Sequence, residues 1–112
     1  VQHAAEVERN WFRRVLTGED APAIFGQRDP DGHDGGFEVS AESSFAVAAQ
    51  IWQDEVEQAR INAAARELHD TAAFMGGEVS LRWIYTHMIA EYARHCGHAD
   101  LIRERIDGQA GV

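Results

Sequence analysis

The chain has 112 residues, of which 45% are hydrophobic and 26% are charged, so it suits one globular domain over residues 1–112 and not a disordered, low-complexity chain. The formal net charge of −9 would repel a phosphate backbone, which argues against a nucleic-acid partner. No apolar stretch approaches the roughly 18 residues of a transmembrane helix, so no membrane partner is expected. The chain opens with Val1 and shows no signal-peptide pattern of a basic region followed by an apolar run.

Residues 3–17 predict the first helix, because apolar residues recur there at helical spacing. The residues in question are Ala4, Val7, Trp11, Phe12, Val15 and Leu16. Gly18 is a plausible stop for this helix. The first helix is therefore expected to present one apolar face.

Residues 18–40 are rich in turn formers and predict a loop, which Phe25 and Phe37 should pin to the body of the protein. The Asp-x-Asp pair that starts at Asp29 resembles the opening of a calcium loop. An EF-hand needs Gly at its sixth position and Glu at its twelfth, and these positions hold Asp34 and Ser40. A solvated turn is the better interpretation.

Residues 41–68 predict the second helix, with Ser40 as its N-cap. Its expected buried stripe consists of Phe45, Ala48, Ala49, Trp52, Val56, Ala59, Ala63 and Leu68. Its expected wet side consists of Asp54, Glu55, Glu57, Arg60 and Arg66. A charge run of this kind is usually a solvated face.

Residues 69–79 predict a second connection, because Gly76 and Gly77 break the helical pattern. Ser80 can cap a third helix that runs to Asp107, with Gly108 as its stop. No segment alternates convincingly as a strand. The predicted fold class is all-α, with three long helices and one long loop, a minimal bundle.

Titratable residues gather on the third predicted helix. At about 100° per residue, His87, Glu91, His95 and His98 fall within an arc of roughly 80° on the helical wheel. The same arc holds the apolar residues Ile84 and Ile102. Because such groups are costly to bury without partners, a metal ion is one explanation for their convergence.

Glu91 and His95 form the sharpest pair, since i and i+4 side chains can reach one point above a helix. A third donor would come from elsewhere, from His3, His33 or His69, and His3 is favoured because it shares a helix face with apolar residues. A His, Glu, His set with an open position suits zinc, nickel or a similar divalent ion.

Other interpretations of these residues stay open at this point. The Glu and His side chains could form a hydrogen-bond network without metal, or lie at a wet end of the bundle. His87 and His98 could orient the ligand side chains by contacting them without binding the metal themselves. The lone Cys96 is interpreted as a structural, partly buried thiol, and it favours a reducing compartment, the cytoplasm. The tryptophans are expected in the core, and no phosphate loop or serine nucleophile motif is seen.

Motifs along the whole chain resemble one known family. They are the opening His3 with residues 6–16 (EVERNWFRRVL), then residues 79–83 (VSLRW), 87–89 (HMI), 91–95 (EYARH) and 97–108 (GHADLIRERIDG). The chain resembles the DinB-like four-helix proteins, in the branch named after the Streptomyces mini-circle protein, and is similar to the N-terminal domains of mycothiol-dependent maleylpyruvate isomerases.

The resemblance implies an up–down helix bundle with a divalent metal near one end. Carried over to this chain, the family's ligands are His3, Glu91 and His95. The family more often has His where Glu91 stands, and Glu there is similar to the isomerase relatives. The family's first helix would precede His3 and is missing here, so either the natural chain is longer or a second subunit supplies that wall. A homodimer is therefore expected.

The function implied is that of a metal-dependent enzyme acting with a low-molecular-weight thiol such as mycothiol, on a small-molecule substrate. His98 or His87 would move protons. Two alternatives are a metal-dependent hydrolase, and a non-catalytic stress or binding protein whose metal is structural or vestigial.

Overall fold

The computed structural model describes residues 1–26 and 35–111. The turn expected at Asp29–Asp34 and the candidate ligand His33 therefore lie outside the described residues. The described chain clusters into two compact units, Val1–Leu81 and Arg82–Val112. The prediction of one domain over residues 1–112 stays a prediction.

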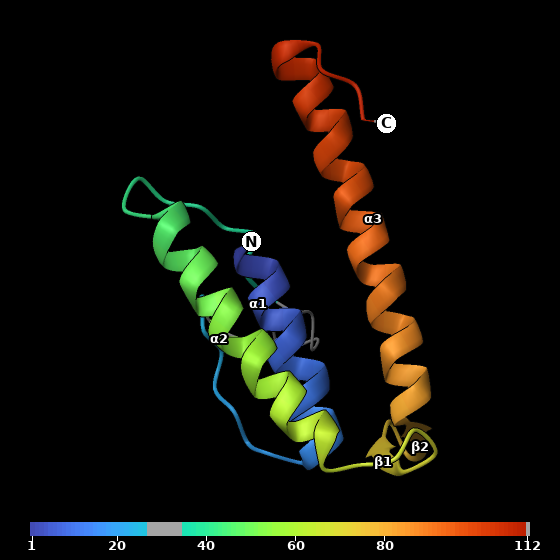
Figure 1. Ribbon diagram of the computed structural model, residues 1–112. Helices are drawn as coiled ribbons and strands as arrows, with labels where there is room; N and C mark the ends of the chain where they lie inside the picture. Colours follow the sequence, from blue (N-terminus) through green and yellow to red (C-terminus); the bar gives the residue numbers. More distant parts are fainter. Residues whose placement is uncertain (27–34, 112) are drawn as a thin grey trace. The chain divides into compact units, whose positions relative to one another are not determined.

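Helices make up most of the described chain (Figure 1). They are α1 (Gln2–Arg9), η1 (Asn10–Val15), α2 (Phe45–Ala64) and α3 (Leu81–Asp107), and a hairpin of β1 (Thr71–Phe74) and β2 (Gly77–Ser80) precedes α3. The all-α prediction is thus confirmed as a mainly helical fold, with the hairpin as an addition. None of the described helices combines the length and apolarity needed to cross a membrane.

The first helix and its apolar face are as predicted. α1 runs directly into η1, which has π-helical turns, and the helix ends where Gly18 takes a φ of +71°. Its buried apolar residues are Ala5, Val7, Trp11, Phe12 and Leu16. They form the core of the first unit together with small residues of α2: Ala48, Ala59 and Ala63.

α1 and α2 pack side by side and run in the same direction (Figure 1). Their beginnings meet, since Val1 and Ser44 line one hollow. Further along, the Asn62 amide donates to the Phe12 carbonyl at 3.0 Å. Consecutive helices of an up–down bundle alternate in direction, so this pair departs from that order. The long connection between Thr17 and Phe45 returns the chain to its starting end.

The start of α2 differs from the prediction. The N-cap is Ser44, whose Oγ accepts from Val47 N at 3.3 Å, and not Ser40. Ser40 is used in a turn of its own, where its Oγ accepts from Glu42 N and its carbonyl accepts from Ser43 N. Phe45, predicted in the buried stripe, is 77% exposed because it stands at the first turn of the helix.

The burial of Glu55 is the largest difference between the predicted and the observed α2. The charge pattern assigned it to the wet side, yet it is only 5% exposed. Its Oε1 accepts from Arg9 Nε at 3.0 Å and from Arg13 Nη1 at 3.0 Å. Two arginines of the first helix therefore pull this carboxylate into the interface with α1, where a charge can be buried because it is paired.

The hairpin was not predicted. β1 and β2 pair antiparallel, with Thr71 opposite Ser80 and Phe74 opposite Gly77. Its turn places Met75 at φ +48° and Gly76 at φ +78°, the left-handed pair that tight hairpins require. The Phe74 ring lies 5.1 Å from the Trp11 ring, so the hairpin packs on the first helix.

Candidate metal site and its surroundings

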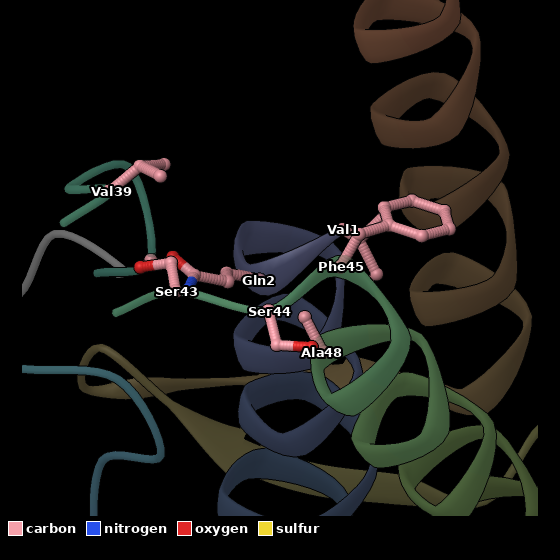
Figure 2. A pocket seen from close by; sticks show the side chains of 8 residues that line it. Val1, Gln2, Val39, Ser43, Ser44, Phe45 and Ala48 are labelled. Atoms are coloured by element: carbon pink, nitrogen blue, oxygen red, sulfur yellow. The ribbon is translucent and has the colours of Figure 1, made fainter. Parts of the chain in front are cut away.

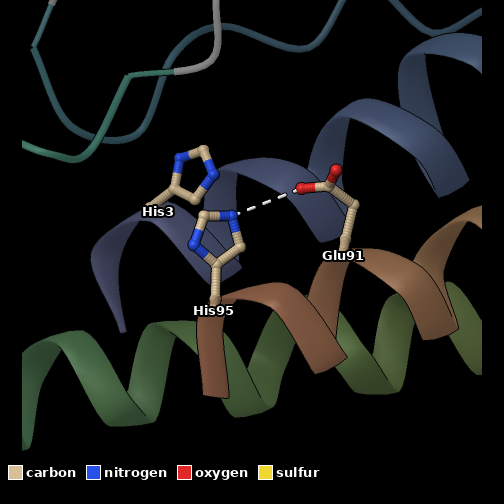
Figure 3. Close-up of side chains that lie close together, drawn as sticks. All are labelled: His3, Glu91 and His95. Carbon is tan, nitrogen blue, oxygen red and sulfur yellow. Dashed lines mark ion pairs between the residues drawn. The ribbon is translucent and has the colours of Figure 1, made fainter. Parts of the chain in front are cut away.

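One face of α3 carries a row of side chains at i, i+4 spacing. The Trp83 and His87 rings stack with centroids 5.0 Å apart and an interplanar angle of 7°. His87 Nε2 lies 3.9 Å from Glu91 Oε1. On the other side, His95 Nε2 lies 3.3 Å from Glu91 Oε2, the ion pair marked in Figure 3. The carboxylate of Glu91 is thus flanked by one imidazole on each side along the helix.

This geometry follows from helical periodicity, because side chains four residues apart lie one above the other. Arg94 adds a cation 3.7 Å from Glu91 Oε1. The Glu91 side chain is only 16% exposed, whereas that of Arg94 is 63% exposed. The structure therefore brings Glu91 and His95 together as sequence spacing predicted, with a carboxylate oxygen and an imidazole nitrogen on one face.

Cys96 and His98, which follow this pair on α3, are exposed. His98 is exposed, and its ring meets the His95 ring edge-on at 5.7 Å. Cys96 is a free, exposed cysteine, which corrects the prediction of a partly buried thiol. It follows His95 directly, so it turns about 100° away from the row around the helix.

His3 lies in the first turn of α1 and belongs to the other unit. Its Nδ1 lies 3.1 Å from the carbonyl oxygen of Gly35, and its ring stacks on Phe37 at 3.9 Å with an angle of 26°. The expectation that Phe37 pins its loop is borne out by this contact. The meeting of His3 with the pair on α3 stays a prediction. His69, the other candidate donor among the described residues, is exposed before the hairpin.

A carboxylate missed by sequence reasoning holds the loop that follows the first helix. Glu6 is 2% exposed, and its Oε1 accepts from the backbone N–H groups of Ile24 and Phe25 at 2.6 and 2.8 Å. Arg14 lies 3.6 Å from the other oxygen. No local pattern identifies this role, because the partners of Glu6 lie 18 and 19 residues away.

A second arginine pairing lies at the surface end of the first helix. Arg13 donates from Nε and Nη2 to the two oxygens of Glu19, at 2.9 and 2.6 Å. This hydrogen bond lowers the pKa of Glu19 below its ordinary value of 4.5. It also raises the pKa of Arg13, so both groups stay charged at neutral pH.

A hollow of about 290 Å³ opens where α1 and α2 begin (Figure 2). Its lining consists of Val1, Gln2, Gly36, Val39, Ser43, Ser44, Phe45 and Ala48. The side-chain oxygen of Gln2 is buried and finds no hydrogen-bond partner among the described residues. Gln2 and Gly36 both adjoin His3, Gln2 in the sequence and Gly36 in space. The hollow is therefore a candidate for binding an apolar group that carries an N–H or O–H donor.

Comparison with known proteins places the chain in a family. A family model described as mycothiol-S-transferase matches residues 1–108. Neither the curated proteins nor the solved structures yield a match. The matched range includes the candidate ligands His3, Glu91 and His95 together with His87 and His98.

Proposed function

The chain belongs to the mycothiol-S-transferase family of DinB-like proteins, and on that premise we propose that it is a divalent-metal-dependent enzyme. It joins a low-molecular-weight thiol of the mycothiol type to an electrophilic small molecule. The observation that carries the proposal is the Glu91–His95 pair at 3.3 Å, flanked by His87, on one face of α3.

The proposed ligands are His3, Glu91 and His95. Two imidazole nitrogens and one carboxylate oxygen are donors that zinc accepts, and nickel is the runner-up. Three protein ligands leave a position for a sulfur atom. A bound divalent cation would supply the charge that lowers the pKa of the thiol and holds it as a thiolate.

The other residues would position the ligands and move a proton. His87 is 3.9 Å from Glu91 Oε1, on the side of the carboxylate away from His95, and so limits its rotation. His98, exposed one turn beyond His95, would take the thiol proton and release it to water. The sulfur would then form a bond to the electrophilic carbon, and the leaving group would depart with the electron pair of the broken bond. The hollow beside His3 would hold the apolar part of the substrate.

Zinc and nickel titration of the purified chain tests the proposal. We expect binding at a stoichiometry of one ion per chain, lost or weakened at least tenfold in His95→Ala. The control is His69→Ala, which removes an exposed histidine outside the proposed site and should bind as the unaltered chain does. Absence of binding, or equal binding by His95→Ala, would refute the metal site.

Thiol dependence tests the reaction class. Turnover of an electrophile should require added thiol and rise with its concentration. Turnover that proceeds equally without thiol would instead favour a metal-dependent hydrolase, in which water takes the place of the sulfur nucleophile.

A further inference from the structure

Three consecutive residues contact His3, each in a different way. The Gly35 carbonyl oxygen lies 3.1 Å from Nδ1 of His3, and the Phe37 ring stacks on the imidazole at 3.9 Å. Gly36 approaches the backbone of α1 at Gln2 and His3. Residues 35 and 37 thus contact the His3 side chain, and residue 36 approaches its backbone, from 32 or more positions along the chain.

The contact with Gly35 fixes the chemistry of the imidazole. A carbonyl oxygen has no proton to give, so Nδ1 of His3 must carry the hydrogen of this bond. In the neutral ring the lone pair is then at Nε2. This is the tautomer that a metal ligand needs when it binds through Nε2, and a backbone carbonyl is a usual partner for the opposite nitrogen.

Gly36 permits the close approach because it has no side chain. A Cβ there would lie 2.7 Å from His3 N, 2.8 Å from Gln2 C and 2.9 Å from His3 Cα, all backbone atoms of the helix. Gly36 also has a φ of +88°, which favours glycine for a second reason. Any other residue would push the segment away from His3.

Phe37 limits rotation of the ring from its face. The stack has an interplanar angle of 26°, yet the Phe37 side chain is 67% exposed. A phenylalanine so exposed contributes little to the core. The Phe37 ring stacks on the imidazole, and loss of Phe37 should therefore affect the orientation of His3.

We propose that residues 35–37 are a positioning device that presents Nε2 of His3 to a divalent cation. This inference rests on the proposed function and deepens it, because it states how a ligand near the start of a helix keeps one ring orientation and one tautomer. None of the three residues is a ligand. They act through His3.

The first test uses the full chain without metal. Nitrogen-15 NMR of the imidazoles, at a pH where histidines are neutral, should show His3 with the hydrogen on Nδ1. In Phe37→Ala the Nδ1–H tautomer should be less populated. Finding His3 with its hydrogen on Nε2 in the unaltered chain would overturn the proposal, whatever the metal data show.

The second test compares zinc affinities within matched pairs. Gly36→Ala should weaken zinc binding about tenfold or more, as loss of an outer partner of a ligand does. The control is Gly26→Ala in the same connection, where φ is +72° but a Cβ meets nothing within 4 Å. It carries the backbone strain alone and should change affinity less than about threefold.

Phe37→Ala keeps the test decisive if Gly36→Ala does not fold. It should weaken zinc binding about threefold to tenfold, the loss expected for one aromatic stack. The control is Ile61→Ala on α2, an apolar residue that is 57% exposed and lies outside the hollow, which should leave affinity unchanged. If zinc binds through His3 but neither variant weakens it, the positioning role is wrong while the proposed function stands. If the unaltered chain binds no zinc, the proposed function itself fails.

Discussion

Replacing Glu55 with alanine should destabilise the protein more than replacing any other charged residue that the sequence pattern assigned to the solvated side of α2. The carboxylate accepts hydrogen bonds from Arg9 and Arg13 while being 5% exposed. Its removal leaves two guanidinium groups, 16% and 21% exposed, facing each other without their shared anion. Arg9 keeps the Pro22 carbonyl and Arg13 keeps Glu19, so the penalty is moderated.

The expected cost is about 2–4 kcal/mol, below the full penalty for stranding a buried charge because each arginine retains one partner. For a urea dependence of about 1.5 kcal/mol per molar, the unfolding midpoint would fall by about 2 M. Circular dichroism in urea measures this. The control is Glu57→Ala on the same helix, whose pair with Arg60 is largely exposed and should contribute less than about 0.5 kcal/mol. Equal midpoints for the two variants would refute the assignment of Glu55 as a buried anchor between α1 and α2.

Three further predictions concern charge, ligands and assembly. Arg13 lowers the pKa of Glu19, so the stabilising contribution of Glu19 exists above pH 4.5 and is lost as pH falls through its folded-state pKa. The thermal midpoint of Glu19→Gln should therefore lie below that of the unaltered chain at neutral pH, and the two midpoints should converge in acid. A difference that stays constant with pH would contradict this. Glu91→Gln should weaken zinc binding at least tenfold. Glu91→His should keep zinc binding at neutral pH but lose it more steeply on mild acidification than the unaltered chain, because three imidazoles instead of two must shed a proton near pH 6.5 to bind. Calorimetry at two pH values measures the difference, and equal pH dependence in the two chains would contradict it. Ile102 and Ile106 are 61% and 79% exposed on α3, and we propose that this face makes the contact of the expected homodimer. Replacing both with glutamate should then lower the mass in sedimentation velocity from dimer to monomer without loss of helix. A monomeric unaltered chain, or an unchanged dimer mass in the variant, would rule out this face as the contact.

Helical periodicity and glycine stops predicted the elements that depend on local sequence. α3 runs to Asp107 and ends at Gly108 as expected, because period, length and stop signal agree along one segment. The start of α2 was misplaced by four residues, since Ser40 and Ser44 carry the same local cap signal. Which serine caps the helix depends on the turn that Ser40 forms with Ser43, and propensity alone does not rank the two.

The errors concern residues whose state is decided by distant partners. Glu55 reads as solvated from its neighbours in sequence, and only Arg9 and Arg13, 46 and 42 residues away, explain its burial. The hairpin has strands of four residues, and β1 contains two alanines that favour no strand. It forms where Phe74 can pack on Trp11, a contact that the local pattern does not carry.

The two arms of the proposed metal site show the same division. Glu91 and His95 are brought together by the period of one helix, so the two side chains stay adjacent as long as α3 is helical and both residues are present. His3 instead depends on a segment 32 positions away, and its tautomer is set by a carbonyl whose residue, Gly35, has no side chain. The glycines in the connection between the first helix and α2 look equivalent in the sequence, yet the structure constrains them unequally. Alanine at Gly26 should cost only the strain of its positive φ, since a Cβ there meets nothing within 4 Å, whereas at Gly36 the same atom would also meet the backbone of the proposed ligand His3.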